Sequence, residues 1–132
     1  GYYDFMITIN ISYGELFDKI SILDIKKIKL TNSDDIKKVT FELNLLTNAL
    51  GKSNIESHSI KQLFNELKKV NLRLWEIEDK IREKEKYNSF DDEFIKLARS
   101  VYITNDKRSK IKKEINISLK SEVIEVKSYQ EY

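Results

Sequence analysis

The chain has 132 residues, with 24 Lys or Arg against 22 Asp or Glu, so its net charge is only +2. These charges are interleaved, which argues against a dedicated nucleic-acid-binding surface. Cysteine is absent, which excludes disulfides and thiolate metal sites and is typical of the cytoplasm. No apolar stretch is long enough to predict a membrane span. We therefore expect a cytoplasmic protein with one helical domain, residues 1–132, in which residues 1–5 are either a tag or unstructured.

A short strand and a helix are expected first. Residues 6–11, "MITINI", alternate strictly between apolar and polar positions, which predicts a strand. Ser12 and Glu15 then form a capping box, so a helix should run from about 13 to 30. That helix is apolar on more than one side, which is typical of a helix at the centre of its fold or in an oligomer.

Two further helices follow at regular apolar spacings of three and four residues. Asn32 or Ser33 should cap the second helix, which runs to about Leu50. Residues 60–81 keep the same spacing for three heptads, which is typical of coiled-coil-like packing. A capping box at Ser59 predicts where this third helix begins.

The fourth helix is expected over about 90–119, with Asn88 or Ser89 as its cap. The connection to the third helix is short, so the two should form an antiparallel hairpin. Near the C-terminus, Ile124 and Val126 alternate with charged residues, which predicts a second strand pairing with the first. The expected fold is mainly α: a helical bundle of two antiparallel hairpins, long third and fourth helices, and a small two-stranded β pair at the termini.

The apolar seam of the fourth helix is interrupted by polar residues. Thr104 and Arg108 occupy positions where the helical rhythm calls for apolar side chains. In the expected hairpin, Asn71 and Asn105 lie at the same level. A buried guanidinium is costly unless it finds an acid, a carbonyl or a bound anion. The sequence therefore predicts a polar layer within the bundle.

Three interpretations of this layer stay open. The first is structural, in which the layer fixes the register of the helices or Arg108 reaches solvent. The second is an anion site, in which Arg108, helped by Arg99, holds a phosphate or carboxylate. The third is an interface with another subunit. The candidates for anion or ligand binding are Arg99, Tyr102, Thr104, Asn105, Arg108 and Asn71.

Two pairs of acids repeat the spacing E-x-x-D. Glu15 and Asp18 lie on the first helix, and Glu76 and Asp79 lie on the third. Residues three apart share a helix face, so two such faces could hold Mg²⁺ through carboxylate oxygens. This spacing is similar to that of the all-α nucleoside triphosphate pyrophosphatases. No cofactor is expected from the sequence, and Mg²⁺ is the one alternative for which it offers ligands.

Four strings of the sequence carry a resemblance to other proteins. They are L-W-x-I-E-D-x-I-R, A-R-S-V-Y-x-T-N-D-x-R, "ISYGELFDKISILDIKKIKL" and the terminal "EVKSYQEY". They resemble a family of short bacterial proteins classed as a domain of unknown function. The resemblance extends from Ile9 to Tyr132 and implies no activity. The positions that match are Trp75, Glu78, Asp79, Arg82, Arg99, Tyr102, Asn105, Asp106 and Arg108.

Two functional hypotheses follow. Coiled-coil periodicity without a recognisable catalytic group favours a non-catalytic interaction or assembly module with a protein partner. Leftover apolar surface on the first helix, with Trp75 and Phe64, predicts a homodimer. The alternative is a small Mg²⁺-dependent enzyme or sensor that acts on a phosphate-bearing ligand, a nucleotide or a sugar nucleotide.

Overall fold

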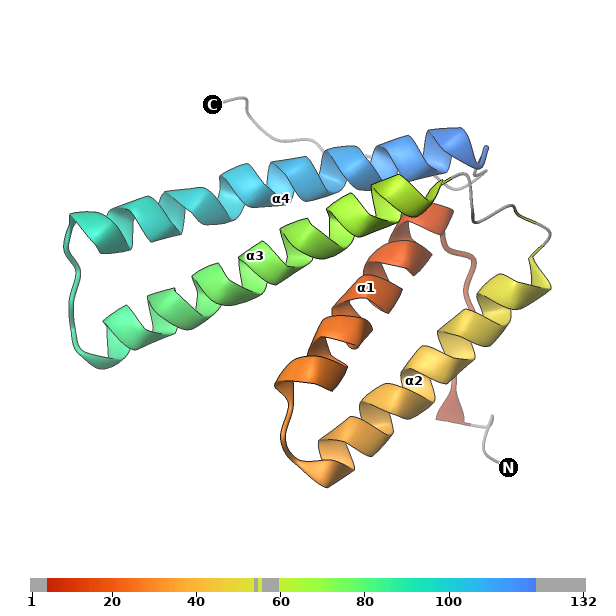
Figure 1. The fold of residues 1–132 in the computed structure, drawn as a ribbon, viewed down its shortest axis with the longest axis horizontal. Helices are drawn as coiled ribbons and strands as arrows, with labels where there is room; N and C mark the ends of the chain where they lie inside the picture. Colours follow the sequence, from red (N-terminus) through yellow and green to blue (C-terminus); the bar gives the residue numbers. More distant parts are fainter. Residues whose placement is uncertain (1–4, 54, 56–59, 121–132) are drawn as a thin grey trace.

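A computed structural model describes residues 5–53, 55 and 60–120. These residues form helices only, which confirms a mainly α protein (Figure 1). The helices are α1 (Tyr13–Lys29), α2 (Ser33–Lys52), α3 (Lys61–Lys86) and α4 (Asp92–Ser118).

Polar side chains fix where three of the helices begin. The hydroxyl of Ser12 accepts a hydrogen bond from the backbone N–H of Glu15 at 3.1 Å, as the capping box predicts. Asn32 caps α2 through the backbone N–H groups of Asp34 and Asp35. These caps satisfy N–H groups that have no partner within their own helix.

The starts of α3 and α4 differ from the prediction. Ile60 is the N-cap of α3, without a capping side-chain bond, and Ser59 lies outside the described residues. Asp91, rather than Asn88 or Ser89, caps α4 by accepting the N–H of Phe94 at 3.0 Å. Asn88 instead has φ 50°, the left-handed conformation that asparagine tolerates better than most residues, and it reverses the chain.

The helices form two hairpins, α1–α2 and α3–α4, and α1 packs against both helices of the second hairpin. Among the described helices, the backbone of α1 closely approaches α2, α3 and α4, whereas the backbone of α2 closely approaches that of α1 alone. The prediction that the first helix is central is therefore confirmed. Helix α1 begins beside the start of α3 and the end of α4, and then diverges from them (Figure 1). The far half of the α3–α4 hairpin consequently extends past α1, and no other helix of the described residues covers it.

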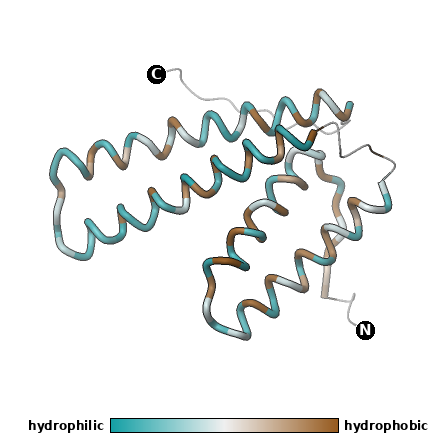
Figure 2. Tube along the Cα trace, viewed as in Figure 1, coloured by the Kyte–Doolittle hydropathy of each residue, from teal (hydrophilic) through white to brown (hydrophobic). Residues whose placement is uncertain are grey.

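Apolar residues of α1 pack in two directions. One side meets α2 in a cluster that includes Leu16, Ile20 and Leu43. The opposite side places Phe17 against residues of α3 and α4, among them Leu67 and Ile115. The hydropathy of the chain follows this arrangement, because hydrophobic segments concentrate on α1 and α2 while the far part of α3–α4 is mainly hydrophilic (Figure 2).

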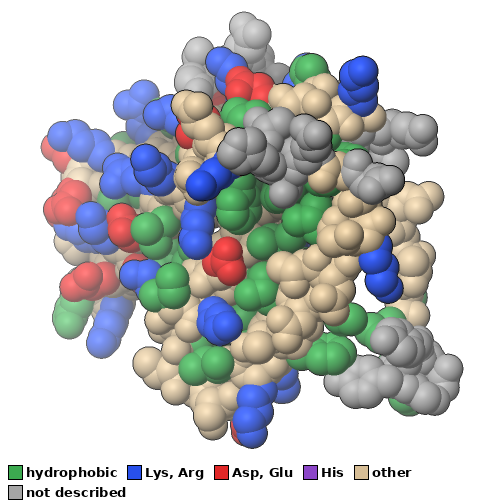
Figure 3. All heavy atoms as spheres, turned by 45° about the vertical axis from the view of Figure 1, so that its right-hand side comes forward, with side chains coloured by type: hydrophobic (Ala, Val, Ile, Leu, Met, Phe, Trp, Pro, Cys, Tyr) green, Lys and Arg blue, Asp and Glu red, His purple; other side chains and the backbone are tan. Residues whose placement is uncertain are grey.

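The ring of Phe64 lies edge-on against that of Phe17, with centroids 5.6 Å apart. Phe64 is half-buried and packs against both core clusters, so it is not the leftover surface that the dimer prediction assumed. A space-filling view shows hydrophobic side chains gathered near the middle of one face, with acidic and basic side chains interspersed over the protruding hairpin at the left (Figure 3).

The predicted β pair is not supported. Residues 6–11 form no strand, and Ile7 and Ile9 are 90% and 70% exposed. Alternation alone does not make a strand, because a strand needs a neighbour for its backbone N–H and C=O groups. Among the described residues no segment provides one. The expected partner, with Ile124 and Val126, lies outside the described residues.

Candidate functional site

The guanidinium of Arg108 meets a buried acid. The side chain of Asp18, on α1, is 1% exposed, and that of Arg108, on α4, is 25% exposed. Nε of Arg108 donates to Oδ1 of Asp18 at 2.9 Å, and Nη2 donates to Oδ2. The two parallel bonds match the planar fork of arginine to a carboxylate. The predicted polar layer exists, but its acid comes from α1.

Asn71 completes the coordination of this carboxylate from α3. Its amide nitrogen donates to Oδ1 of Asp18 at 2.9 Å and to the hydroxyl of Ser21 at 2.7 Å. Ser21 in turn donates to the backbone carbonyl of Asp18 at 2.8 Å. Three helices thus meet at one carboxylate. No buried side-chain nitrogen or oxygen in the described part of the chain lacks a hydrogen-bond partner.

A second set of contacts ties the start of α1 to α4. The ammonium of Lys112 donates to Oε2 of Glu15 at 2.7 Å and lies 3.8 Å from Oδ2 of Asp18. The backbone N–H of Gly14 donates to Oδ1 of Asn116 at 2.6 Å. A Cβ at Gly14 would overlap the carbonyl oxygen of Lys112, so only glycine permits this approach of the two backbones. We call these residues the junction: Gly14, Glu15, Asp18, Ser21, Asn71, Arg108, Lys112 and Asn116.

Electrostatics favour the ionised form of Asp18. Burial raises the pKa of this carboxyl, but hydrogen bonds from Arg108 and Asn71, with the charges of Arg108 and Lys112, outweigh burial. The net effect lowers the pKa below its ordinary value of 3.8. Asp18 is therefore a carboxylate at neutral pH, and it compensates the charge of Arg108 from within the chain.

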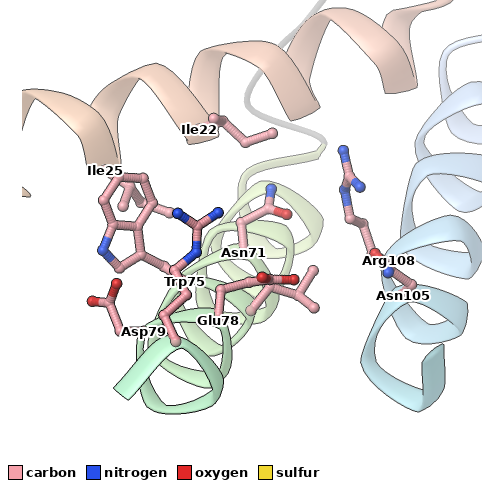
Figure 4. Close-up of a pocket in the computed structure, with 10 residues that line it drawn as sticks. Ile22, Ile25, Asn71, Trp75, Glu78, Asp79, Asn105 and Arg108 are labelled. Atoms are coloured by element: carbon pink, nitrogen blue, oxygen red, sulfur yellow. The ribbon is translucent and has the colours of Figure 1, made fainter. Parts of the chain in front are cut away.

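A groove of about 510 Å³ adjoins the junction where α1 leaves α3. Ile22 and Ile25 of α1 line one side, and Trp75 and Glu78 of α3 line the other, while Arg108 extends from α4 toward α1 (Figure 4). Its volume lies in the range typical of ligand pockets, and an apolar wall beside a few polar groups is typical of binding sites. The full lining is Ile22, Ile25, Asn71, Leu74, Trp75, Glu78, Asp79, Arg82, Asn105 and Arg108.

The structure brings together some predicted candidates and separates others. Asn71, Asn105, Arg108 and the acid Asp79 line the groove. Thr104 is buried in the hairpin, 8% exposed, and is not part of the groove lining. Arg99, Tyr102 and Glu76 are exposed and do not line it either, and Glu15 and Asp18 belong to the junction and not to the groove lining.

The two acidic pairs do not form one site. Glu15 and Asp18 are engaged by Lys112 and Arg108. Over residues 5–53, 55 and 60–120, no group of three or more His, Cys, Asp or Glu side chains could hold a metal ion. The E-x-x-D pairs share helix faces as their spacing requires, but those faces do not meet as a four-carboxylate cluster.

Sequence reasoning missed the contributions of α1 and of the end of α4. Ser21, Lys112 and Asn116 were not among the candidates, nor were the apolar groove residues Ile22 and Ile25. A signal existed, since Asp18 and Ser21 are three apart on a helix whose other sides are apolar. Polar residues on a face that must be buried predict a partner, though not which one.

Comparisons with known proteins add a family. No curated protein and no solved structure matches the chain. None of the helices formed by the described residues is long and apolar enough to cross a membrane. The model of a family of unknown function, DUF6165, matches residues 7–132, and the chain therefore belongs to this family.

Proposed function

We propose that this protein is a non-catalytic helical interaction module whose binding surface is the groove beside the junction. The observation that carries the proposal is the divergence of α1 from α3. It leaves the apolar side chains Ile22, Leu74 and Trp75 along a groove instead of beneath a neighbouring helix. Apolar and aromatic surface rimmed by polar groups is typical of protein interaction sites.

The charges of the groove favour a basic occupant. Arg108 is compensated by Asp18, so its charge contributes little outside that pair. Glu78 and Asp79 are exposed and form no ion pair with any described residue. Their two negative charges exceed the single positive charge of Arg82, which also lines the groove. Because an indole also attracts cations, the groove suits a segment that presents basic side chains beside apolar ones.

The phosphate-ligand alternative draws less support. It places the anion on Arg108, whereas this guanidinium already donates to both oxygens of Asp18. It also needs a group of carboxylates for Mg²⁺, and the acids of α1 are engaged by cations of α4. The interaction module requires neither feature.

Trp75 is the only tryptophan of the chain and lies in the groove, so its fluorescence reports on binding there. We expect a saturable fluorescence change on titration with the peptide acetyl-Leu-Lys-Leu-Lys-amide, weakened by salt because exposed charges are screened. The matched peptide acetyl-Leu-Glu-Leu-Glu-amide should produce no saturable change.

Variants assign the effect to the groove. The double substitution Glu78→Gln with Asp79→Asn should abolish the response to the basic peptide. Glu76→Gln, an exposed acid of the same helix outside the groove, should retain it. Equal responses to both peptides, or none to either, would contradict the proposal. A thermal shift of the unchanged protein with nucleotides and Mg²⁺ would instead favour the phosphate-ligand alternative.

A further inference from the structure

We infer that the occupant of the groove is a second copy of this chain, which inserts the last turn of its own α1. This inference rests on the proposed function, because it names the partner for the same groove. It makes the groove one half of a reciprocal, two-fold interface.

The last turn of α1 has the chemistry that the groove suits. Lys26, Lys27 and Lys29 lie in this turn, and Ile28 between them is 74% exposed. Lysines at a helix C-terminus interact favourably with the helix dipole, which accounts for them without a partner. The dipole does not account for Ile28, a large apolar side chain held in solvent. We call Lys27, Ile28 and Lys29 the basic knob.

The knob and the groove lie next to each other. Ile25 lines the groove, and Ile28 follows it by three residues, about one turn further along the same helix. In a two-fold dimer each surface patch must contain both halves of the contact, since residue i meets residue j in both directions. The basic knob lies at the rim of the groove of its own chain, so one surface patch contains both halves of the contact. A two-fold rotation about an axis through this patch brings the knob of each copy to the groove of the other.

The charges are complementary across such an interface. The exposed Glu78 and Asp79 of one copy would face Lys27 and Lys29 of the other, and Ile28 would cover the apolar wall near Trp75. The contact area is confined to one helix turn and one groove in each direction. We therefore expect a weak dimer that dissociates on dilution and at high salt.

A charge-swap complementation tests this arrangement. The groove variant carries Glu78→Lys and Asp79→Lys, and the knob variant carries Lys27→Glu and Lys29→Glu. Each variant alone places like charges together, so its dimerisation constant should weaken by about tenfold or more in sedimentation velocity. An equimolar mixture restores opposite charges at both contacts, so heterodimers should form with about the affinity of the unchanged protein.

Controls separate this result from general effects of charge. Lys37→Glu with Lys38→Glu changes the same charge on exposed residues of α2 and should leave dimerisation unchanged. Circular dichroism should show that every variant keeps its helix content. A dimer that persists in both charge-swap variants, or one that is lost in both but not restored by mixing, overturns the inference.

The outcome also separates this inference from the proposed function. If the unchanged protein is monomeric at every concentration while Trp75 still reports binding of the basic peptide, the second-copy partner is wrong and the groove remains a binding surface. If neither dimer nor peptide binding is found, both proposals fall.

Discussion

The junction and the open end of the α3–α4 hairpin both involve α3 and α4, but they differ in whether their polar side chains find partners within the chain. At the junction, Asp18 is sealed and bound by groups from α3 and α4. At the open end, α1 has diverged, and Trp75 lies in a groove beside exposed carboxylates. Polar groups at the junction are satisfied within the chain, whereas the groove carboxylates Glu78 and Asp79 are available to a partner.

The contrast teaches which polar residues to read as functional. An arginine in an apolar seam invites a ligand interpretation, yet Arg108 finds its anion within the chain. Removing junction residues should therefore change stability. Removing the groove carboxylates Glu78 and Asp79 should change binding and leave stability within about 0.5 kcal/mol, as is usual for exposed positions.

The largest expected effect is at Arg108. Arg108→Leu leaves the buried carboxylate of Asp18 without its bidentate partner, and losing one member of a buried ion pair typically costs about 3–5 kcal/mol. Urea denaturation should show this loss in the free energy of unfolding. Arg99→Leu, an exposed arginine of the same helix, is the matched control and should change stability by less than about 0.5 kcal/mol. Equal losses of stability in the two variants would show that Arg108 contributes no more to folding than an exposed arginine does.

Gly14→Ala should have the next largest effect. The added Cβ would lie 2.9 Å from Oδ1 of Asn116 and would also overlap the carbonyl oxygen of Lys112, which belongs to the backbone of α4. Overpacking of this kind typically costs about 1–3 kcal/mol. Gly51→Ala is the matched control, because nothing lies within 4 Å of its Cβ and alanine favours a helix over glycine. It should raise the melting temperature, whereas Gly14→Ala should lower it.

A smaller effect should appear with pH. The folded state lowers the pKa of Asp18 below 3.8, so its contribution to stability is fully present above that pH. The contribution is lost as the pH falls through the lower, folded-state value. Urea midpoints measured below pH 4 should therefore fall more steeply for the unchanged protein than for Asp18→Asn. Parallel curves for the two proteins would show that Asp18 does not titrate differently on folding.

The smallest effect concerns the turn at the open end. The hydrogen bond from Lys84, together with that from the N–H of Phe94, lowers the pKa of Asp91 from 3.8 to about 2. Lys84→Met should raise this pKa toward its ordinary value, measured by NMR titration of the carboxyl group. Stability should barely change, because exposed ion pairs contribute little. If the pKa of Asp91 is the same in Lys84→Met as in the unchanged protein, Lys84 does not bind Asp91 in solution.

Much of the fold follows from local patterns in the sequence. The cap at Ser12 and the α3–α4 hairpin are determined by residues near one another along the chain, and the apolar faces of the first helix predict that it is central. The polar layer was also predictable, because Thr104 and Arg108 break an otherwise apolar rhythm. The strand at residues 6–11 was wrong because pairing, and not alternation, makes a strand.

The partner of Arg108 could not be predicted in the same way. The short turn near Asn88 fixes how α3 and α4 align, so the hairpin places Asn71 near Arg108 correctly. Where α1 lies against that hairpin depends on packing between residues about 90 positions apart in sequence. The spacing of Asp18 from Glu15 therefore predicts a metal site, whereas the neighbour of Asp18 in space is a guanidinium.

A double-mutant cycle on Asp18 and Arg108 tests the central claim most directly. The free energies of unfolding of the unchanged protein, Asp18→Asn, Arg108→Leu and the double variant give the coupling between the two side chains. We predict a favourable coupling on the order of 2–3 kcal/mol, so that the double variant is far more stable than the two single losses would add up to. A coupling near zero would show that the two groups act independently, and the junction would then lose its role as the element that joins the two hairpins.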